Sequence, residues 1–463
     1  MHPSDTTSRA ELEAALLRRL RGGSPAIPRL PRPPGPARFP ASPAQAEACA
    51  RAWRDPARPD RVVLTGLRLR GPLDVRALER ALAAVVRRHE TLRTAFEETE
   101  DGLVQVISPV LDVPVTVVEA TEDDFAAQTL AALEPAMDLR TGPLIRFRLL
   151  RLTAEEHIAI VVLHHVIADA RATEVLLADL AEAYLGADLA PLPIQYADFV
   201  VWQRDRPGRA AAVAAKVEYW RTRLAGAPAV PIPADSPPFD GPAHRGDLLT
   251  VGVPDDLFAR LRAFARAHDT TIFVTALAAF QVLLARLGGA RDVAVSVPVT
   301  LRDRAEVEGL IADFSQAMVS RLDLAGDPSF ETVAATARDR FAEDLDHAGV
   351  PREPVVRELP GHVAELFDRV EFGVDRETAT DGAGLDLEPL PPRLPYAERP
   401  LTVRLGHDEE HATLYVTYRC RDFSRARAAD LAADYLTVLA GGLDHPAAGL
   451  FGPGAPALRS GRR

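Results

Sequence analysis

The chain contains 463 residues, of which 47% are hydrophobic and 26% are charged, and its formal net charge is −12. This length and composition favour a folded protein of two or three domains and exclude a chain that is disordered throughout. The acidic balance disfavours a nucleic-acid-binding protein, because such proteins need a basic face. No apolar run approaches the roughly 18 residues of a membrane-spanning helix, so a membrane protein is also excluded.

The N-terminus and the cysteines indicate the compartment. Residues 1–21 mix acidic and basic side chains and lack the apolar stretch of a secretory signal. The two cysteines, Cys49 and Cys420, fit no metal-binding or redox motif and suit a reducing environment. We therefore expect a cytoplasmic protein without a metal site.

The two ends of the chain differ from the part between them. Residues 9–21 have the spacing of an amphipathic helix, and residues 24–43 contain eight prolines, which block a helix or a central strand. We expect residues 1–40 to form this helix and an extended lead-in. The Gly-, Pro- and Arg-rich residues 451–463 are expected to form a flexible tail.

Two successive groups of elements lie between these ends. In residues 41–185 the apolar periodicity predicts helices at 45–53, 75–86, 122–134 and 170–185 and strands at 61–69, 103–107, 114–118, 143–151 and 157–163. In residues 186–450 it predicts helices at 210–224, 254–268, 271–287, 329–347, 353–367 and 424–440 and strands at 247–252, 292–298, 314–322, 369–374, 401–405 and 412–419. The strands 143–151 and 157–163 are expected to pair as a hairpin. Strands mixed with helices in two groups predict two α/β lobes.

One segment carries residues suited to catalysis. The strand at 157–163 runs into His164 and His165, and Asp169 precedes the next helix. A turn between a strand and a helix can hold a side chain rigidly at a cleft. Adjacent histidines on extended backbone point opposite ways, so one can face a cleft, and histidine suits proton transfer near neutral pH. The spacing alone equally allows two core histidines and an aspartate that caps the helix.

The segment HHVIADA at 164–170 resembles the HHxxxDG signature of the condensation domains of nonribosomal peptide synthetases, within the chloramphenicol-acetyltransferase-like superfamily. Further motifs of that family follow in the same order, and they are SPAQAEACARAW (42–53), RHETLRTAF (88–96), QYADFVVWQ (195–203), VSVPVTLRDR (295–304) and VPREPVVREL (350–359). Several motifs in the family order are far more specific than one. Within them, His89, Glu90, Tyr196 and Trp202 are expected to be structural.

The resemblance implies two chloramphenicol-acetyltransferase-like lobes in a V with a tunnel between them. It implies a free-standing condensation enzyme that takes an acyl or aminoacyl group from the phosphopantetheine thioester of an acyl or peptidyl carrier protein in trans. The group would pass to an amine or hydroxyl of a free or carrier-bound acceptor, without a cofactor bound to this chain. His165 would be the catalytic residue in the tunnel. His164, Asp169 and Arg302 would form its scaffold, with an ion pair between Asp169 and Arg302.

Three departures from the family pattern bear on the substrate. The last glycine of the signature is Ala170, and the segment I-G-x-F-V-N-T reads IADFSQA at 311–317. We therefore consider Ala170, Asp313, Ser315 and Gln316 as candidates for the tunnel lining or the acceptor pocket. Asp313 and Gln316 hint at a cationic or polyhydroxylated acceptor, with a solvated strand edge as the alternative. The segment R-D-x-S-R-x-P survives only as GHVAELFDRV at 361–370.

Two other functions stay open. An epimerization domain shares the signature, but its E-G-H-G-R motif is replaced by TLRDR at 300–304. A catalytically silent, condensation-like module that recruits another enzyme agrees with the drift at 311–317, whereas the intact His165 and Asp169 favour catalysis. The sequence also contains no adenylation signature, carrier-protein serine or nucleophile elbow.

Overall fold

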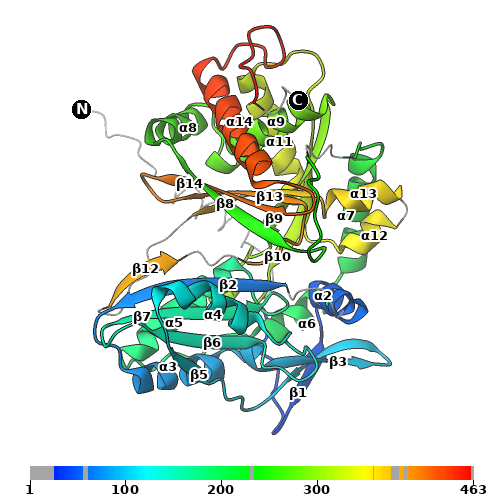
Figure 1. The fold of residues 1–463 in the computed structure, drawn as a ribbon. Helices are drawn as coiled ribbons and strands as arrows, with labels where there is room; N and C mark the ends of the chain where they lie inside the picture. Colours follow the sequence, from blue (N-terminus) through cyan, green and yellow to red (C-terminus); the bar gives the residue numbers. More distant parts are fainter. Residues whose placement is uncertain are drawn as a thin grey trace, which may run out of the picture.

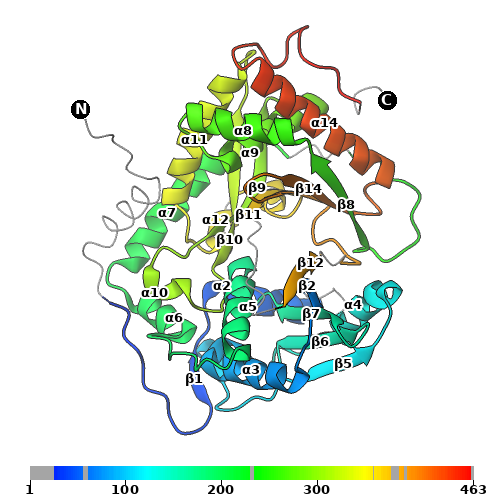
Figure 2. The same ribbon diagram turned by 90° about the vertical axis from the view of Figure 1, so that its left-hand side faces the viewer.

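The computed structural model describes residues 26–55, 61–229, 234–357, 359–376, 385–390 and 394–459. The amphipathic helix expected at 9–21 lies outside these residues. Strands of the described chain form a three-stranded, a five-stranded and a six-stranded sheet. Figures 1 and 2 show the two larger sheets in separate halves of the molecule, with helices packed on them. The mixed α/β class is therefore confirmed.

The first half holds the two smaller sheets. The five-stranded sheet has the order β12-β2-β7-β6-β5, and its strands are β2 (Val62–Arg70), β5 (Val115–Glu119), β6 (Ile145–Arg151), β7 (Glu156–His164) and β12 (Asp386–Leu390). The three-stranded sheet has the order β1-β4-β3, with β1 (Ala37–Pro40), β3 (Thr94–Thr99) and β4 (Gly102–Ile107). The helices of this half are α2 (Pro43–Arg54), α3 (Val75–Arg88), α4 (Phe125–Leu133), α5 (Ala170–Tyr184) and α6 (Tyr196–Asp205).

Strand β7 is the central strand that leads to the two histidines. Every residue from His157 to His164 is buried, because the five-stranded sheet is covered on both faces at this strand. β6 and β7 pair antiparallel as expected for the hairpin. Helices α3 and α5 pack against each other beside the sheet. The apolar run at 157–163 therefore forms a buried central strand, which holds the start of the turn at His164 and His165 in place.

The second half is built on the six-stranded sheet. Its order is β10-β9-β11-β13-β14-β8, and its strands are β8 (Gly246–Val253), β9 (Asp292–Thr300), β10 (Ser315–Asp323), β11 (Val370–Arg376), β13 (Leu401–His407) and β14 (Ala412–Arg419). Its helices are α7 (Arg209–Leu224), α8 (Asp255–Ala267), α9 (Ile272–Gly288), α10 (Ala305–Glu308), α11 (Phe330–Asp346), α12 (Arg352–Val356), α13 (Gly361–Leu366) and α14 (Arg425–Asp444). Every residue of α9 from Val274 to Ala285 is buried, as expected for a helix that is apolar all round.

The predicted helix at 353–367 is wrong as a single element. The structure divides it into α12 and α13, because Pro360 has no N–H to continue a helix and instead caps the start of α13. Among the described strands and α-helices, β1, β3, β12, α6 and α10 were not predicted. Strand β12 comes from the second half of the chain but pairs antiparallel with β2 in the first sheet. The chain division near residue 186 stays a prediction.

The described part of the predicted flexible tail lies against the second half. The N–H of Phe451 donates a hydrogen bond to Asp327 over 2.7 Å, and the N–H of Arg459 donates to Asp434 over 2.6 Å. The guanidinium of Arg291 also lies 3.4 Å from the centre of the Phe451 ring. These contacts hold the tail to the fold as far as Arg459.

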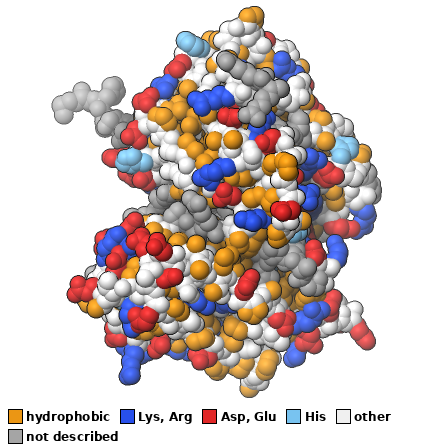
Figure 3. Space-filling model, viewed as in Figure 1, with side chains coloured by type: hydrophobic (Ala, Val, Ile, Leu, Met, Phe, Trp, Pro, Cys, Tyr) orange, Lys and Arg blue, Asp and Glu red, His pale blue; other side chains and the backbone are white. Residues whose placement is uncertain are grey.

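The surface carries charges of both signs, and the helices were compared with the length and hydropathy of membrane spans. Basic and acidic side chains are interspersed over the face drawn in Figure 3. At the β2–β12 edge, for example, Arg70 pairs with Asp386 and Glu388. Within the described ranges no single helix is long and apolar enough to cross a membrane, although α8 and α9 pass that test when taken as a pair bent by 109°.

Candidate functional site

A cavity of about 560 Å³ lies where the two halves meet. Its lining combines α2, the end of β7 and the start of α6 with the start of β10, the segment 349–352 and the segment 398–399. It contains six arginines and six carboxylates, which are Arg51, Arg61, Arg140, Arg209, Arg352, Arg399, Glu47, Asp55, Asp138, Asp313, Asp368 and Glu398. The formal charges of these twelve side chains sum to zero. The net charge of the lining therefore favours neither a strongly cationic nor a strongly anionic ligand.

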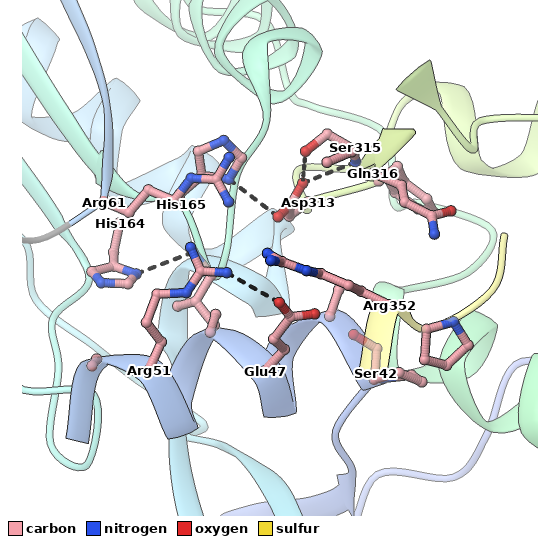
Figure 4. Close-up of a pocket in the computed structure, with 18 of the residues that line it drawn as sticks. Ser42, Glu47, Arg51, Arg61, His164, His165, Asp313, Ser315, Gln316 and Arg352 are labelled. Atoms are coloured by element: carbon pink, nitrogen blue, oxygen red, sulfur yellow. Dashed lines mark hydrogen bonds and ion pairs between the residues drawn. The ribbon is translucent and has the colours of Figure 1, made fainter. Parts of the chain in front are cut away.

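The backbone of His164 and His165 is fixed from both sides. The His164 N–H donates to the Leu144 carbonyl over 2.9 Å, and the His165 N–H donates to the Arg61 carbonyl over 2.8 Å. Both histidines line the cavity, and Figure 4 shows their rings pointing in different directions. The side chain of His165 is 18% exposed, whereas His164 is 3% exposed. His165 is therefore the more accessible of the two.

His164 serves the turn that follows β7. Its Nδ1 accepts a hydrogen bond from the N–H of Val166 over 3.1 Å, which fixes this nitrogen as an acceptor. Burial, with smaller contributions from His165 and Arg61, lowers the pKa of His164 to about 3. The ring is thus neutral at physiological pH and holds the backbone of this turn, and the scaffold role of His164 stays a prediction.

Asp169 and Arg302 form the ion pair that the resemblance implies. Arg302 Nη2 lies 3.0 Å from Asp169 Oδ1, and the two side chains are only 3% and 7% exposed. Asp169 also caps α5, because Oδ1 accepts from the N–H of Ala172 over 2.8 Å. Its Oδ2 accepts from the N–H of Phe314 over 3.0 Å. The helix cap and the ion pair were considered as alternatives from the sequence, and the structure contains both.

The side chain of Arg302 binds the segment 303–314, which connects β9 to β10 and crosses between the two halves. Its guanidinium donates to the carbonyls of Val307, Leu310 and Ala312 over 2.7 to 3.1 Å. It also lies 4.4 Å from the centre of the Phe314 ring, which packs in one apolar cluster with α6. This single side chain therefore connects the end of β9, the crossing segment and the start of α5.

Asp313 lies against His165. Its Oδ2 is 3.1 Å from His165 Nδ1, and its Oδ1 accepts hydrogen bonds from the N–H and the Oγ–H of Ser315 over 2.9 and 2.6 Å (Figure 4). Burial by itself would raise the pKa of Asp313, but His165, the Ser315 hydroxyl and Arg61 outweigh it and lower the pKa below its ordinary value. Asp313 and Ser315 line the cavity, and both carboxylate oxygens of Asp313 are already engaged.

Gln316 lines the cavity, whereas Ala170 does not. Gln316 lines the cavity, but its amide holds the neighbouring loop, because Oε1 accepts from the N–H of Gly349 over 2.7 Å and Nε2 donates to the Val350 carbonyl. Ala170 is exposed and does not line this cavity, since the cap at Asp169 turns the chain into α5 at that point. Ala170, a candidate for the tunnel lining or the acceptor pocket, is therefore outside the lining of this cavity.

Arg61 and Glu398 are site residues that the sequence did not indicate. Arg61 Nε lies 3.2 Å from Glu398 Oε1. Burial would raise the pKa of Glu398, but Arg61, Arg399 and His165 lower it, so the carboxylate stays ionised beside the histidine. Arg61 stands at the start of a predicted strand, whereas Glu398 lies outside every predicted element. Nothing in the local pattern shows that the two meet.

His89, Glu90 and Tyr196 of the supporting motifs make contacts with other parts of the fold. His89 Nε2 is 2.6 Å from Asp179 Oδ2, and burial lowers the pKa of His89 although Asp179 opposes this. Glu90 receives a hydrogen bond from Arg32 over 2.8 Å. The ring of Tyr196 meets Phe314 edge to face at 5.2 Å. These contacts join the end of α3 to α5, the turn after α3 to the chain before β1, and α6 to the start of β10.

Comparison with known proteins identifies the family. The model of the condensation domain matches residues 60–451. One of the linear gramicidin synthase subunits from Brevibacillus parabrevis is 37% identical over 309 residues, which are 64% of this chain and 6% of that protein. Chondramide synthase cmdD from Chondromyces crocatus is 33% identical over 400 residues, which are 82% of this chain and 10% of that protein. The chain thus spans a small part of the length of these curated relatives.

Solved structures agree with this assignment. The X-domain in its complex with OxyB from teicoplanin biosynthesis is 29% identical, with a TM-score of 0.79 over 92% of this chain and 97% of that one. SgcC5 from Streptomyces globisporus, in complex with a naphthyl ethanediol and sucrose, is 26% identical, with a TM-score of 0.73 over 89% of this chain and 100% of that one. The condensation domain of the polyketide synthase MokA shares the fold, with 21% identity and a TM-score of 0.76 over 89% of this chain and 99% of that one. The chain has the chloramphenicol-acetyltransferase-like fold and belongs to the condensation-domain family of nonribosomal peptide synthetases.

Proposed function

We propose that this chain is an acyltransferase that forms an amide or an ester. It takes an acyl or aminoacyl group from the phosphopantetheine thioester of a carrier protein in trans and passes it to an amine or hydroxyl. The observation that carries the proposal is His165, a partly accessible histidine in the cavity between the two halves, held by paired backbone on both sides. His165 is the catalytic residue of this proposal.

The arrangement of the cavity suits a reaction between two separate substrates. Its walls come from both halves, so a donor arm and an acceptor can approach His165 from different sides in the tunnel that the resemblance implies. The similar SgcC5 was solved with a diol, which supports a site that accepts a ligand with hydroxyl groups. The relatives include subunits of a linear gramicidin synthase and a chondramide synthase, and the family is that of the condensation domains of nonribosomal peptide synthetases, which agrees with acyl transfer.

The reaction needs a base when the acceptor attacks the thioester, because the attacking nitrogen or oxygen must lose a proton. The acceptor nitrogen or oxygen bonds to the thioester carbonyl carbon while His165 takes its proton. The C–S bond then breaks, and the proton passes to the departing thiolate. General-base help of this kind is worth about 10² to 10⁴ in rate. Asp169 and Arg302 keep the loop of His165 in place, and no covalent intermediate on the protein is required.

A transfer assay tests this proposal. The purified chain is given carrier proteins loaded with a panel of acyl groups, together with amine and alcohol acceptors, and the carriers are followed by intact mass. We expect loss of the acyl group from one carrier and formation of an equal amount of product. Equal turnover with the corresponding acyl-coenzyme A would contradict the requirement for a carrier-bound thioester.

A recruiting module is the second candidate function. The observation that favours it is the similarity to the X-domain, which was solved in complex with OxyB. The two functions differ in their need for His165. If product formation in the producing cell requires the chain but not His165, the chain acts by recruitment. If His165→Ala stops product formation while the variant stays folded, the catalytic function is supported.

A further inference from the structure

We infer that Asp313 is a positioning residue that fixes His165 as a proton acceptor through Nε2, and that it adapts the site to a hydroxyl acceptor. This inference rests on the proposed acyl transfer and names the acceptor class for it. It starts from the contact between Asp313 Oδ2 and His165 Nδ1 at 3.1 Å. These two residues stand 148 positions apart and come from different halves of the molecule.

The carboxylate is oriented before any substrate binds. The N–H and the hydroxyl of Ser315 both donate to Oδ1, which turns Oδ2 toward the imidazole. Asp313 fills the open position of the I-G-x-F-V-N-T pattern, and Ser315 replaces its valine. Ser315, which orients the carboxylate, is therefore one of the departures from this pattern, whereas the pattern leaves the position of Asp313 open.

The contact decides which ring nitrogen of His165 carries the proton. An ionised carboxylate can only accept hydrogen bonds, so Nδ1 must be the protonated nitrogen of the neutral ring. Nε2 then keeps its lone pair, and no other described residue hydrogen-bonds to it. When Nε2 takes a proton, the positive charge forms directly beside Asp313, which stabilises it.

This arrangement matters more for a hydroxyl than for an amine. An amine with a pKa of about 8 is already partly neutral near pH 7 and can attack without a base. A hydroxyl holds its proton and gains the full benefit of a base. Because the formal charges of the lining balance, the cavity adds no preference for a cationic acceptor. A pre-oriented His165–Asp313 pair therefore favours ester formation.

The tautomer of His165 can be measured without any reaction. The protein is labelled with ¹⁵N-histidine, and the signals of His165 are assigned from their loss in His165→Gln. At pH 8 we expect a protonated Nδ1 and an unprotonated Nε2 in the wild type. In Asp313→Asn the Ser315 donors keep the amide oxygen on their side, so the amide NH₂ faces Nδ1 and moves the proton to Nε2. A wild-type ring protonated at Nε2, or an unchanged tautomer in Asp313→Asn, would overturn the inference.

Paired acceptors test the acceptor class. The carrier-bound thioester is offered with 2-phenylethanol or with 2-phenylethylamine, which share one carbon skeleton. Asp313→Asn should lower kcat for the alcohol about 100-fold and for the amine less than about 10-fold. Asp313→Glu should restore part of the alcohol rate, and the exposed Asp303→Asn on the same connection is the control. An equal loss for both acceptors would refute the hydroxyl preference. A wild type that transfers to no acceptor of the amine and alcohol panel would refute the proposed function, while the tautomer measurement still decides the role of Asp313.

Discussion

The ion pair between Asp169 and Arg302 should couple the stability of the two halves. We consider the variants Asp169→Asn and Arg302→Met, which remove the charges with little change in size. Each single variant leaves the other charge buried, since the two side chains are 7% and 3% exposed. Stranding a buried charge costs about 3 kcal/mol of the free energy of unfolding, and the remaining hydrogen bonds to Arg302 reduce this somewhat.

The double variant separates the ion pair from the helix cap. Asp169→Asn also places an NH₂ opposite the N–H of Ala172 or of Phe314. This cost occurs with or without Arg302, so it cancels in a double-mutant cycle. We expect a coupling energy of about 2 kcal/mol from urea unfolding of the four proteins.

The opposite view treats Asp169 only as the cap of α5. A cap is worth about 1 kcal/mol and does not depend on Arg302. A coupling energy near zero would therefore refute the ion pair as a stabilising contact. It would also remove Arg302 from the scaffold that holds the loop of His165.

Three further predictions concern packing and ionisation. Gly442→Ala should destabilise the protein by about 1 to 3 kcal/mol in thermal or urea unfolding, because the new Cβ would lie 2.6 Å from the buried ring of Phe330; unchanged stability would contradict this packing. Burial raises the pKa of Cys49 to about 12, so iodoacetamide at pH 8 should leave it unmodified in the folded protein, and peptide mass spectrometry showing rapid alkylation would contradict its burial. The folded pKa of His164, lowered to about 3, lies below its unfolded value of 6.5, so its contribution to stability is present above pH 6.5 and is lost as the pH falls. Urea unfolding between pH 7 and 5 should therefore show a steeper loss in the wild type than in His164→Asn, by up to about 1.4 kcal/mol per pH unit, and equal slopes would refute a neutral His164.

The sequence was sufficient where the signal is local. The apolar run at 157–163 predicts β7, and the apolar stripe at 75–86 predicts α3, whose N-cap is Asp74. Strand β12 was missed because its short sequence DLEPL contains a proline and alternates poorly. Helix α6 was missed because it is buried mainly along its first half and lacks a clear apolar face.

The site was predictable only in part, because only some of its residues lie in local sequence motifs. The signature indicates His164, His165 and Asp169, and the family motif at 295–304 indicates Arg302. The partner of His165 is not visible in the sequence, because 148 positions separate it from Asp313 and no periodicity connects them. The sequence suggested Asp313 as a candidate for the tunnel lining or the acceptor pocket, and the fold places it in the cavity lining against His165.

A single-turnover measurement with His165→Ala tests the central claim most directly. A carrier protein loaded with its acyl group is mixed with an excess of enzyme and the acceptor, and product is followed by intact mass. Unfolding temperature and the same change at the exposed His411 serve as controls. The proposed function predicts a loss of at least about 100-fold in the transfer rate with an unchanged fold. Full transfer by a correctly folded His165→Ala protein would contradict it.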